Sequence, residues 1–581
     1  MKTRLILLII AVSSLAACDN NEKAGTAERT AKGDVFYGGV FRVNEVEDFR
    51  NLFPLNVTEA TSQRVTNQIY EGLVKLSQKD LSVLPSLAEK WEVNEDATSF
   101  TFHLRKGVKF HDDPAFENGK GREVTAHDFK YCFELLCTDF SENQGFWLFK
   151  DRVVGANEYF NSTTAKAPLK EGVTGIKVVD NYTIQIDLKY PYAGFIHILS
   201  TPFTKVFPKE AFEKYGVEMR THCVGTGPFS VKNIKEGKAV VLQRNPDYWD
   251  YDEFGNQLPY LDAIKTSFIK EKKSELLEFK KGNLEMVYRL PLEMIKDVTS
   301  ELENAKKENI PFELQNTPAQ STFYYGFQHK GNLFNNKNLR LAFNYAIDRE
   351  SIVNYTLQGE GVPGIYGIVP PAFKNYNNSS KLIGYKYDPE KARKHMADAG
   401  YPNGKGFPKI TLQINSGGGD RNIQTAEVIQ KMLKENLDID VHIDVMPFAQ
   451  HLDALETGKA EFWRTAWIAD YPDPENFLNL LYGQHIPATL PEKSYINSVR
   501  YYSPAFDSLF KAGLREVDPE KRNELYLMAE QTAIDDGAVM PIFYDENTRL
   551  IQVYVKDFDI NSMEYRDFSR VYLDPRLRKV Q

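Results

Sequence analysis

The stretch from Lys409 to Pro447 constrains the fold most, because it has the pattern of a βαβ unit. Apolar residues alternate in Ile410–Ile414 and again in Ile439–Val445, which predicts two strands. A glycine-rich turn at 416–419 and a helix over 422–436 would join them. Strands connected through a helix in this way lie parallel in one sheet. We therefore expect an α/β fold.

Other segments support the same fold class. Phe100–Leu104 is predicted to be a strand, and 176–188 a pair of strands that turn at Asp180. Three Asp-Pro pairs predict helix starts, because Asp accepts hydrogen bonds from the first turn and Pro has no N–H to lose there. These pairs are Asp388-Pro389, Asp473-Pro474 and Asp518-Pro519.

The N-terminus, residues 1–17, has the layout of a cleavable secretory signal peptide. Its apolar run is shorter than the roughly twenty residues that span a bilayer. The quartet that ends at Cys18 resembles the lipobox of bacterial lipoproteins, in which the cysteine carries the lipid. Residues 18–33 are polar and are predicted to be a flexible tether. The chain is thus expected in the periplasm or cell envelope, lipid-anchored to a membrane; the alternative is an ordinary signal peptide with a chance cysteine.

Composition restricts the partners. The net charge is −9 and no block of Lys and Arg occurs, which disfavours a nucleic-acid partner. No later segment resembles a transmembrane run, so a soluble body is expected. Aromatic residues make up 13% of the chain. They indicate either a large core or a groove lined with rings, and composition does not separate the two.

Motifs for catalysis or metal binding fail on their context. Gly359–Gly364 matches G-x-G-x-x-G, but a helix precedes it where a strand is required, Pro363 interrupts it and two prolines follow at 370–371, so we interpret it as a loop. His111 and its neighbours lack the spacing of a metal site, and Asp128 is better explained as a helix cap. We predict no catalytic residue, no metal and no cofactor. Three further cysteines, Cys132, Cys137 and Cys223, are interpreted as small buried apolar residues.

The segment 462–477 is the most informative for binding. Asp470 lies among aromatic residues, where a partly desolvated carboxylate would favour a cation such as a peptide α-ammonium. Arg464, six residues earlier, could bind a carboxylate through two hydrogen bonds. The alternative, equally compatible with the sequence, is that Asp470 and Arg464 pair with each other for structural reasons.

Several blocks in order resemble extracellular solute-binding protein family 5, the oligopeptide-, dipeptide- and nickel-binding receptors of ABC importers. The resemblance covers nearly the whole mature chain. Its blocks are Tyr70–Leu73, Leu84–Ala88, Thr101–His111, Thr125–Asp128, Gly225–Phe229, Arg244–Trp249, Asn338–Arg340, Ala346–Asp348 and Trp467–Pro474.

The resemblance implies a large two-lobed periplasmic-binding-protein fold of class II, with an inserted third domain and the ligand buried between lobes joined by hinge strands. Lobe I would comprise 34–69, 174–265 and 540–581. The inserted domain would span 70–173, and lobe II 266–539. In some peptide-binding members a disulfide-forming cysteine follows the tryptophan matched by Trp467; here that position is Ile468.

The resemblance also implies the site and the partners. Asp470 would hold the peptide α-ammonium, Arg464 would face the carboxylate, and Trp467 would lie beside the ligand. The resemblance also places Glu59 and Ala60 where the first lobe touches the peptide backbone. Trp463 is a further candidate contact because it lies near Asp470 in the sequence. We expect a monomer that delivers peptides to a membrane permease and ATPase. A nickel complex, haem or an oligosaccharide as ligand, a peptide-sensing lipoprotein and a secreted hydrolase are the alternatives.

Overall fold

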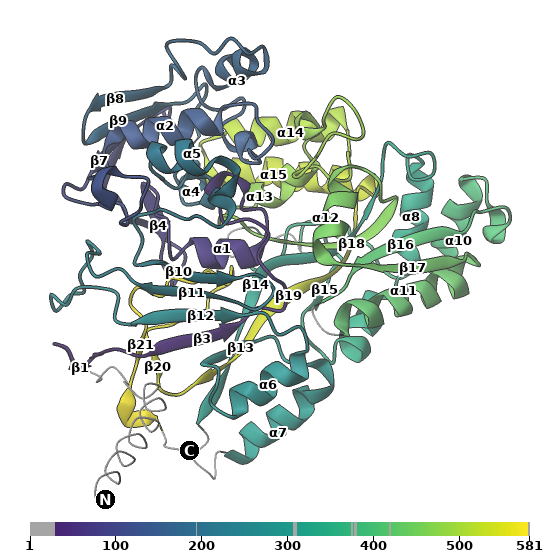
Figure 1. Ribbon diagram of the computed structural model, residues 1–581. Helices are drawn as coiled ribbons and strands as arrows, with labels where there is room; N and C mark the ends of the chain where they lie inside the picture. The colour runs from purple at the N-terminus through teal and green to yellow at the C-terminus, as the bar shows by residue number, and fades with distance from the viewer. Residues whose placement is uncertain are drawn as a thin grey trace, which may run out of the picture.

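The computed structural model describes residues 29–192, 194–305, 311–373, 376, 380–417 and 420–578. Strands and helices are mixed along this part of the chain (Figure 1), and none of its helices is long and apolar enough to cross a membrane. The expected signal peptide and Cys18 lie outside the described residues. The expected tether is too long, because Arg29–Thr30 (β1) pairs with Phe36–Tyr37 (β2) and so belongs to regular structure before Gly33.

The largest sheet contains the predicted βαβ unit. Ile410–Asn415 (β16) and Val441–Met446 (β17) pair in parallel, and Arg421–Leu437 (α11) connects them, which confirms the prediction. The strand order is β13-β19-β14-β18-β16-β17, and β15 pairs with β19. The other strands are Met286–Tyr288 (β13), Phe312–Phe327 (β14), Val362–Pro363 (β15), Phe462–Ile468 (β18) and Met540–Gln552 (β19).

Strand β15 corrects the interpretation of 359–364 as a loop. Val362 and Pro363 pair with Tyr544 and Phe543 of β19. Proline has no N–H to donate to the ladder. Pro363 is compatible with this position because β15 is a short strand that does not need a ladder hydrogen bond from each of its residues.

Helices pack on this sheet around a core of phenylalanine rings. Lys337–Ala346 (α8) and Pro389–Asp398 (α10) contact each other and α11. The ring of Phe462 on β18 stacks 5.4 Å from Phe327 and meets Phe343 of α8 edge-on at 5.5 Å. Burial of such rings is the main stabilising contribution of this core.

The predicted caps at Asp388 and Asp518 are confirmed. The helix after Asp473 begins one residue later than predicted, with Pro474 at its N-cap position, although the Asp473 side chain still accepts from its first N–H group. Asp388 accepts a hydrogen bond from the backbone N–H of Lys391 at 2.9 Å, at the start of α10. Asp473 accepts from Glu475 at 2.9 Å and Asp518 from Glu520 at 3.0 Å. The helices that follow are Glu475–Leu478 (α13) and Pro519–Asp535 (α15).

A second sheet brings distant parts of the chain together. Val40–Asn44 (β3) pairs in parallel with Ala263–Ser267 (β12), some two hundred residues later. Phe229–Lys235 (β10) and Ala239–Arg244 (β11) complete the order β10-β11-β12-β3. In Figure 1 this sheet lies below α1 and beside the long strands β14 and β19.

A third sheet has the order β6-β7-β9-β8. Ser99–Leu104 (β7) is the predicted strand, and Ile176–Asp180 (β8) and Thr183–Asp187 (β9) form the predicted antiparallel pair. Ala88–Val93 (β6) is the fourth strand. Because β9 pairs with β7, this sheet crosses the boundary at 173 that we expected for the inserted domain. A unit that contains the whole sheet has to extend at least to residue 187.

Strands β14 and β19 form a long antiparallel pair from Phe312–Gln552 to Tyr325–Met540. We expected residues from 540 onward in lobe I. Strand β19 nevertheless pairs along its length with β14, so the expected boundary at 540 cuts through one sheet.

The remaining elements connect and cover the three sheets. The strands are Val74–Leu76 (β4), Val83–Pro85 (β5), Val555–Lys556 (β20) and Tyr572–Leu573 (β21). The helices are Ala60–Thr66 (α1), Ala126–Leu136 (α2), Ala156–Thr164 (α3), Phe195–Ile198 (α4), Lys209–Tyr215 (α5), Lys272–Lys280 (α6), Ile295–Ala305 (α7), Arg349–Ser351 (α9), Phe448–Glu456 (α12) and Pro504–Arg515 (α14).

Helix α2 carries two of the cysteines in its body and at its end. Thr125 and Asp128 form the expected capping box at its start. Cys132 and Cys137 are buried and unpaired, and burial raises the pKa of both thiols. Cys223 is also unpaired but only partly buried. The interpretation as buried apolar residues is therefore confirmed for Cys132 and Cys137 and is too strong for Cys223.

Candidate ligand-binding site

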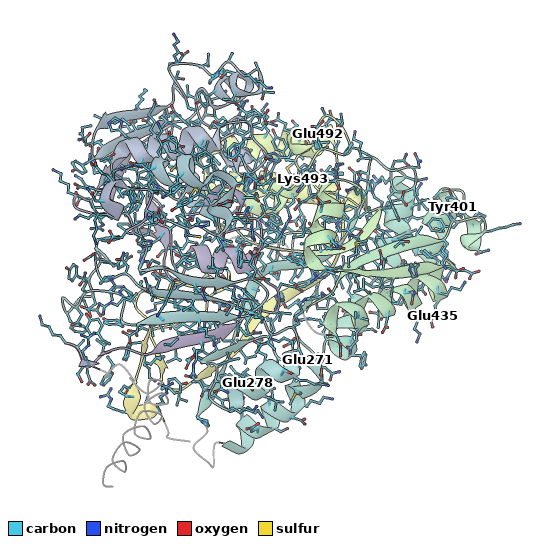
Figure 2. The ribbon with its side chains drawn as sticks, in the orientation of Figure 1. Glu271, Glu278, Tyr401, Glu435, Glu492 and Lys493 are labelled. Atoms are coloured by element: carbon cyan, nitrogen blue, oxygen red, sulfur yellow. The ribbon has the colours of Figure 1, made fainter. Side chains whose placement is uncertain are left out.

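Two adjoining cavities of about 240 and 250 Å³ form one cleft between residues 45–64 and strand β18. The residues that line both cavities are Glu59, Ala60, Arg289, Phe323, Phe448 and Arg464. Figure 2 labels Glu271, which lines the first cavity, below the central strands, and Lys493 above them. The Lys493 ammonium lies 3.7 Å from Glu456, which lines the second cavity.

Asp470 is an uncompensated carboxylate in the second cavity. Its Oδ2 accepts one hydrogen bond, from the side-chain amide of Asn476 at 3.2 Å, and no cation pairs with it among the described residues. Burial raises the pKa of Asp470 to about 7, because little around it stabilises the charge. A positively charged ligand group at this point would supply the missing partner.

Asn476 also fixes the surroundings of Asp470. Its Oδ1 accepts hydrogen bonds from the backbone N–H of Asp470 at 3.0 Å and from the indole N–H of Trp467 at 2.8 Å. The Trp467 ring lies 5.6 Å from the ring of Tyr495, and both line the second cavity. Sequence reasoning missed Asn476, although its place at the start of α13, three residues after the Asp473 cap, is visible in the sequence.

At pH 8, replacing Asp470 by asparagine is expected to raise the melting temperature of the ligand-free protein. Asparagine can still accept from Asn476 and removes a charge that burial disfavours. The gain should grow from about pH 4, where an unfolded Asp ionises, to about pH 7, the pKa in the folded protein, and then stay constant. Thermal unfolding at pH 5 and pH 8 measures it. A variant less stable than the parent at pH 8 would contradict the uncompensated charge.

Arg464 lies on β18 and faces the cleft without a carboxylate partner in the described part of the chain. It donates to Asn415 Oδ1 at 2.9 Å, and its guanidinium lies 4.7 Å from the centre of the Phe323 ring. Burial lowers the pKa of Arg464 to about 10, so it remains charged at neutral pH. It does not pair with Asp470, so the structural ion pair that we kept as an alternative does not form.

His451 supports the strand that carries Arg464. Its Nε2 lies 2.8 Å from the carbonyl oxygen of Arg464, and its Nδ1 lies 2.9 Å from the amide nitrogen of Gln413. A neutral imidazole that donates from Nε2 and accepts at Nδ1 satisfies both contacts. Burial lowers the pKa of His451 to about 4, in agreement with this neutral form.

Two further arginines, Arg289 and Arg421, surround Phe323. Their guanidiniums lie 5.3 and 5.9 Å from its ring. Arg289 pairs with Asp545, and Arg421 lies 3.3 Å from Glu360 and 3.6 Å from Asp545. Two carboxylates therefore compensate two of the three arginines, and Arg464 provides the uncompensated charge. The sequence offered no indication that Arg289 and Arg421 would lie near Arg464, because the three arginines come from distant segments.

Glu59 and Ala60 line both cavities, at the start of α1. Glu59 caps this helix, and its carboxylate accepts from the backbone N–H groups of Ser62 at 2.9 Å and Arg50 at 3.1 Å. The Glu59 carboxylate oxygens therefore already accept hydrogen bonds within the protein and have little capacity left for a ligand. Ala60 presents a small side chain and backbone to the cleft, where another backbone can approach closely.

Trp463 does not face the cleft. Adjacent residues of a strand point to opposite sides, so Arg464 in the cleft places Trp463 on the other face. There its ring is fully buried against Gly326, where a Cβ would lie 2.5 Å from the indole. The expected ligand contact of Trp463 therefore has no support in the geometry. No group of three His, Cys, Asp or Glu side chains in the described ranges could hold a metal ion.

The comparison with known families fits this arrangement. A model of bacterial extracellular solute-binding proteins, family 5, middle region, matches residues 82–487, well over half of the chain. The chain belongs to this family. The family-5 protein is 29% identical over 524 residues to the periplasmic oligopeptide-binding protein OppA of Salmonella typhimurium, covering 88% of each chain. It is 25% identical over 582 residues to heme-binding protein A of Haemophilus influenzae, covering 99% of this chain and 100% of that protein.

Solved structures of relatives have the same fold. The periplasmic binding protein DppA of Helicobacter pylori, in complex with the peptide STSA, gives a TM-score of 0.79 at 25% identity, covering 93% of this chain and 98% of that one. OppA of Haemophilus influenzae, in complex with RPPGFSPFR, also gives 0.79, at 24% identity, covering 92% and 98%. The family-5 protein thus has the two-lobed, mixed α/β fold of class II binding proteins, which confirms the predicted family and fold.

The members of this family are extracellular or periplasmic solute-binding proteins of transporters, and they are not enzymes. In the family-5 protein, Ile468 directly follows Trp467, so the cysteine that the resemblance led us to look for at this position is absent from its sequence. Its three described cysteines are unpaired, so no disulfide fixes this part of its cleft.

Proposed function

We propose that this chain is the extracytoplasmic receptor of an ABC importer, that it captures short peptides and delivers them to a membrane permease, and that it catalyses no reaction. The observation that carries the proposal is the pair of uncompensated opposite charges in one cleft. Among the described residues, Asp470 has no cation partner and Arg464 has no carboxylate partner, and a peptide with free ends carries one group of each kind. The peptide-binding relatives support the same ligand class.

The spacing of these two residues suggests the length of the ligand. Asp470 follows Arg464 by six residues. At about 3.3 Å per residue, the two backbone positions are at most about 20 Å apart. An extended peptide covers a similar length per residue. A peptide of about six residues is therefore long enough to reach both charges, and a shorter one suffices where the side chains of Arg464 and Asp470 extend toward each other.

Titration calorimetry with an unmodified tetrapeptide and its N-acetylated form tests the ligand class. We expect the unmodified peptide to bind much more tightly. Haem is the competing ligand, because heme-binding protein A is similar over nearly its full length. A haemin titration with a Soret shift, together with no heat from peptides, would contradict the peptide proposal.

The binding cycle would be closure of two lobes over the peptide. We propose two lobes and an inserted domain with two boundaries moved: the inserted domain extends from 70 at least to 187, and β19 stays in one sheet with β14 of lobe II, because the boundaries expected at 173 and 540 each cut through a sheet. Contacts from α1 on one side and β18 on the other favour the closed form once the peptide is bound, and the permease would recognise that form.

The affinity for free-amino peptides is expected to have a maximum between about pH 7 and 8. Below pH 7 the Asp470 carboxylate, with a pKa of about 7, becomes protonated and loses its charge. Above about pH 8 the peptide α-amine, whose ordinary pKa is 7.7–8.0, loses its proton. Calorimetry from pH 5.5 to 9 measures the loss of affinity on both sides of this maximum. Glu59 and Glu456 also have a raised pKa from burial, so an N-acetylated peptide serves as the control for their titration.

A lipid on Cys18 would keep the receptor at the membrane where its permease works. The anchor is expected to depend on Cys18 alone, since no helix in the described ranges can span a bilayer. Labelled palmitate should be incorporated into the parent protein and not into a Cys18→Ser variant. Equal incorporation in the two proteins would contradict the anchor.

A further inference from the structure

A third cavity, of about 220 Å³, shares no lining residue with the peptide cleft and is strongly basic. Its walls come from residues 147–152, 189–190, 479–485 and the last turn of α14. Figure 1 shows α14 beside the helices of residues 126–164. Its charged lining residues are Lys150, Asp151, Arg152, Lys189, Lys511 and Arg515.

Only part of this positive charge is compensated. Arg152 is buried and pairs with buried Glu475 at 2.5 Å, and Lys189 lies 3.4 Å from Glu158. Lys150 donates to the carbonyl oxygen of Gln484 at 2.8 Å. Lys150, Lys511 and Arg515 have no carboxylate partner in the part of the chain that the structure describes.

The neutral lining residues add hydrogen-bond donors. Asn479 Nδ2 and Trp147 Nε1 are buried N–H groups with no acceptor among the described residues, and both side chains line this cavity. His485 Nε2 lies 2.7 Å from Asn479 Oδ1, to which it donates a hydrogen bond. Burial lowers the pKa of His485, and the nearby charges of Lys150 and Arg152 lower it further. Unused donors and excess positive charge are what an anion site requires, and they are unfavourable when it is empty.

The size and chemistry of the cavity restrict the ligand. Pockets for drug-sized molecules measure about 300–1,000 Å³, so this one suits a smaller group. Lys and Arg together with N–H donors favour a compact group with several acceptor oxygens. We propose that this cavity binds a phosphate group, either of a free phosphate compound or of an anionic lipid headgroup.

A bound phosphate would connect two parts of the receptor. Residues 147–152 belong to the proposed inserted domain, and 479–515 to the proposed lobe II. An anion held by Lys150 on one side and by Lys511 and Arg515 on the other adds a contact that exists only while these parts are together. Occupancy would therefore favour the closed form and increase the affinity for peptide, a coupling that rests on the proposed function.

A double charge reversal, Lys511→Glu with Arg515→Glu, tests the site. Both side chains are exposed on α14, so the fold should tolerate the change. Lys405→Glu with Lys409→Glu is the matched control, because these are two exposed lysines elsewhere with the same change in charge. Pyrophosphate and vesicles of phosphatidylglycerol are the two probes, with sodium chloride at equal ionic strength and phosphatidylcholine vesicles as blanks.

We expect pyrophosphate or the anionic vesicles to bind the parent and the control variant and to bind the α14 variant about tenfold or more weakly. The probe that responds identifies the source of the phosphate. Each titration is repeated with saturating peptide, which occupies the cleft arginines. Equal binding by both variants, or binding that peptide abolishes, would overturn the site. Peptide affinity that pyrophosphate leaves unchanged would overturn only the coupling to closure.

Discussion

Replacing Asp470 by alanine is expected to weaken the binding of free-amino peptides by about 30-fold or more. Removing one member of a buried, hydrogen-bonded charge pair costs about 2–5 kcal/mol, and each 1.4 kcal/mol is a factor of ten. The loss should be large here because Asp470 has no cation partner among the described residues, while the other carboxylates of this cavity, Glu59 and Glu456, are engaged within the protein. N-acetylated peptides, which lack that charge, should bind the variant and the parent nearly equally.

Calorimetry with both peptide forms separates this role from general damage to the cleft. Glu461→Ala is the matched control, because Glu461 is an exposed carboxylate directly before the same strand. It should bind both peptides like the parent. An equal loss of affinity for free and acetylated peptides in the Asp470 variant would refute the contact with the α-ammonium.

Replacing Arg464 by alanine is expected to remove the discrimination between free-carboxylate and amidated peptides. Hydrogen bonds to a charged group contribute about 1.5–3 kcal/mol, so the free-carboxylate peptide should lose about tenfold to 100-fold in affinity. The amidated peptide should lose much less. Arg464→Lys keeps the charge but not the two parallel hydrogen bonds, and an intermediate loss is expected.

The test of Arg464 is informative only if Arg289 and Arg421 do not bind the peptide carboxylate in its place. Both are already compensated by Asp545 and Glu360, which is why Arg464 should dominate. If the Arg464→Ala variant still prefers the free carboxylate by the factor seen in the parent, a different residue binds that end. The assignment of Arg464 would then be wrong, while the role of Asp470 would stand.

The secondary structure was predictable where it depends on neighbours in the chain. The βαβ unit follows from apolar residues at every second position, and the caps at Asp388 and Asp518 follow from a side chain that reaches N–H groups two or three residues later. Strand pairing between distant segments was not predictable in this way. The pairing of β7 with β9 and of β14 with β19 crosses both of the domain boundaries that were expected at 173 and 540.

The residues of the candidate site were likewise predictable where they lie close together in the chain and not where their role depends on tertiary contacts. Asp470, Arg464 and Trp467 were found because one short segment contains all three, and they lie in or beside one cleft. Asn476 orients two of them through hydrogen bonds that the sequence did not indicate. Trp463 was expected at the ligand on its proximity in sequence alone, and strand alternation directs it into the core instead.

The βαβ pattern at 409–447 already determined an α/β protein, and the ordered motifs determined its family. The sequence by itself also identified the two charges of opposite sign on β18 and just beyond it. Only the tertiary structure decided that these charges are uncompensated. Compensation depends on atoms within a few ångström. Asp545 and Glu360 come from distant segments to neutralise Arg289 and Arg421, and Arg464 has no carboxylate partner in the part of the chain that the structure describes.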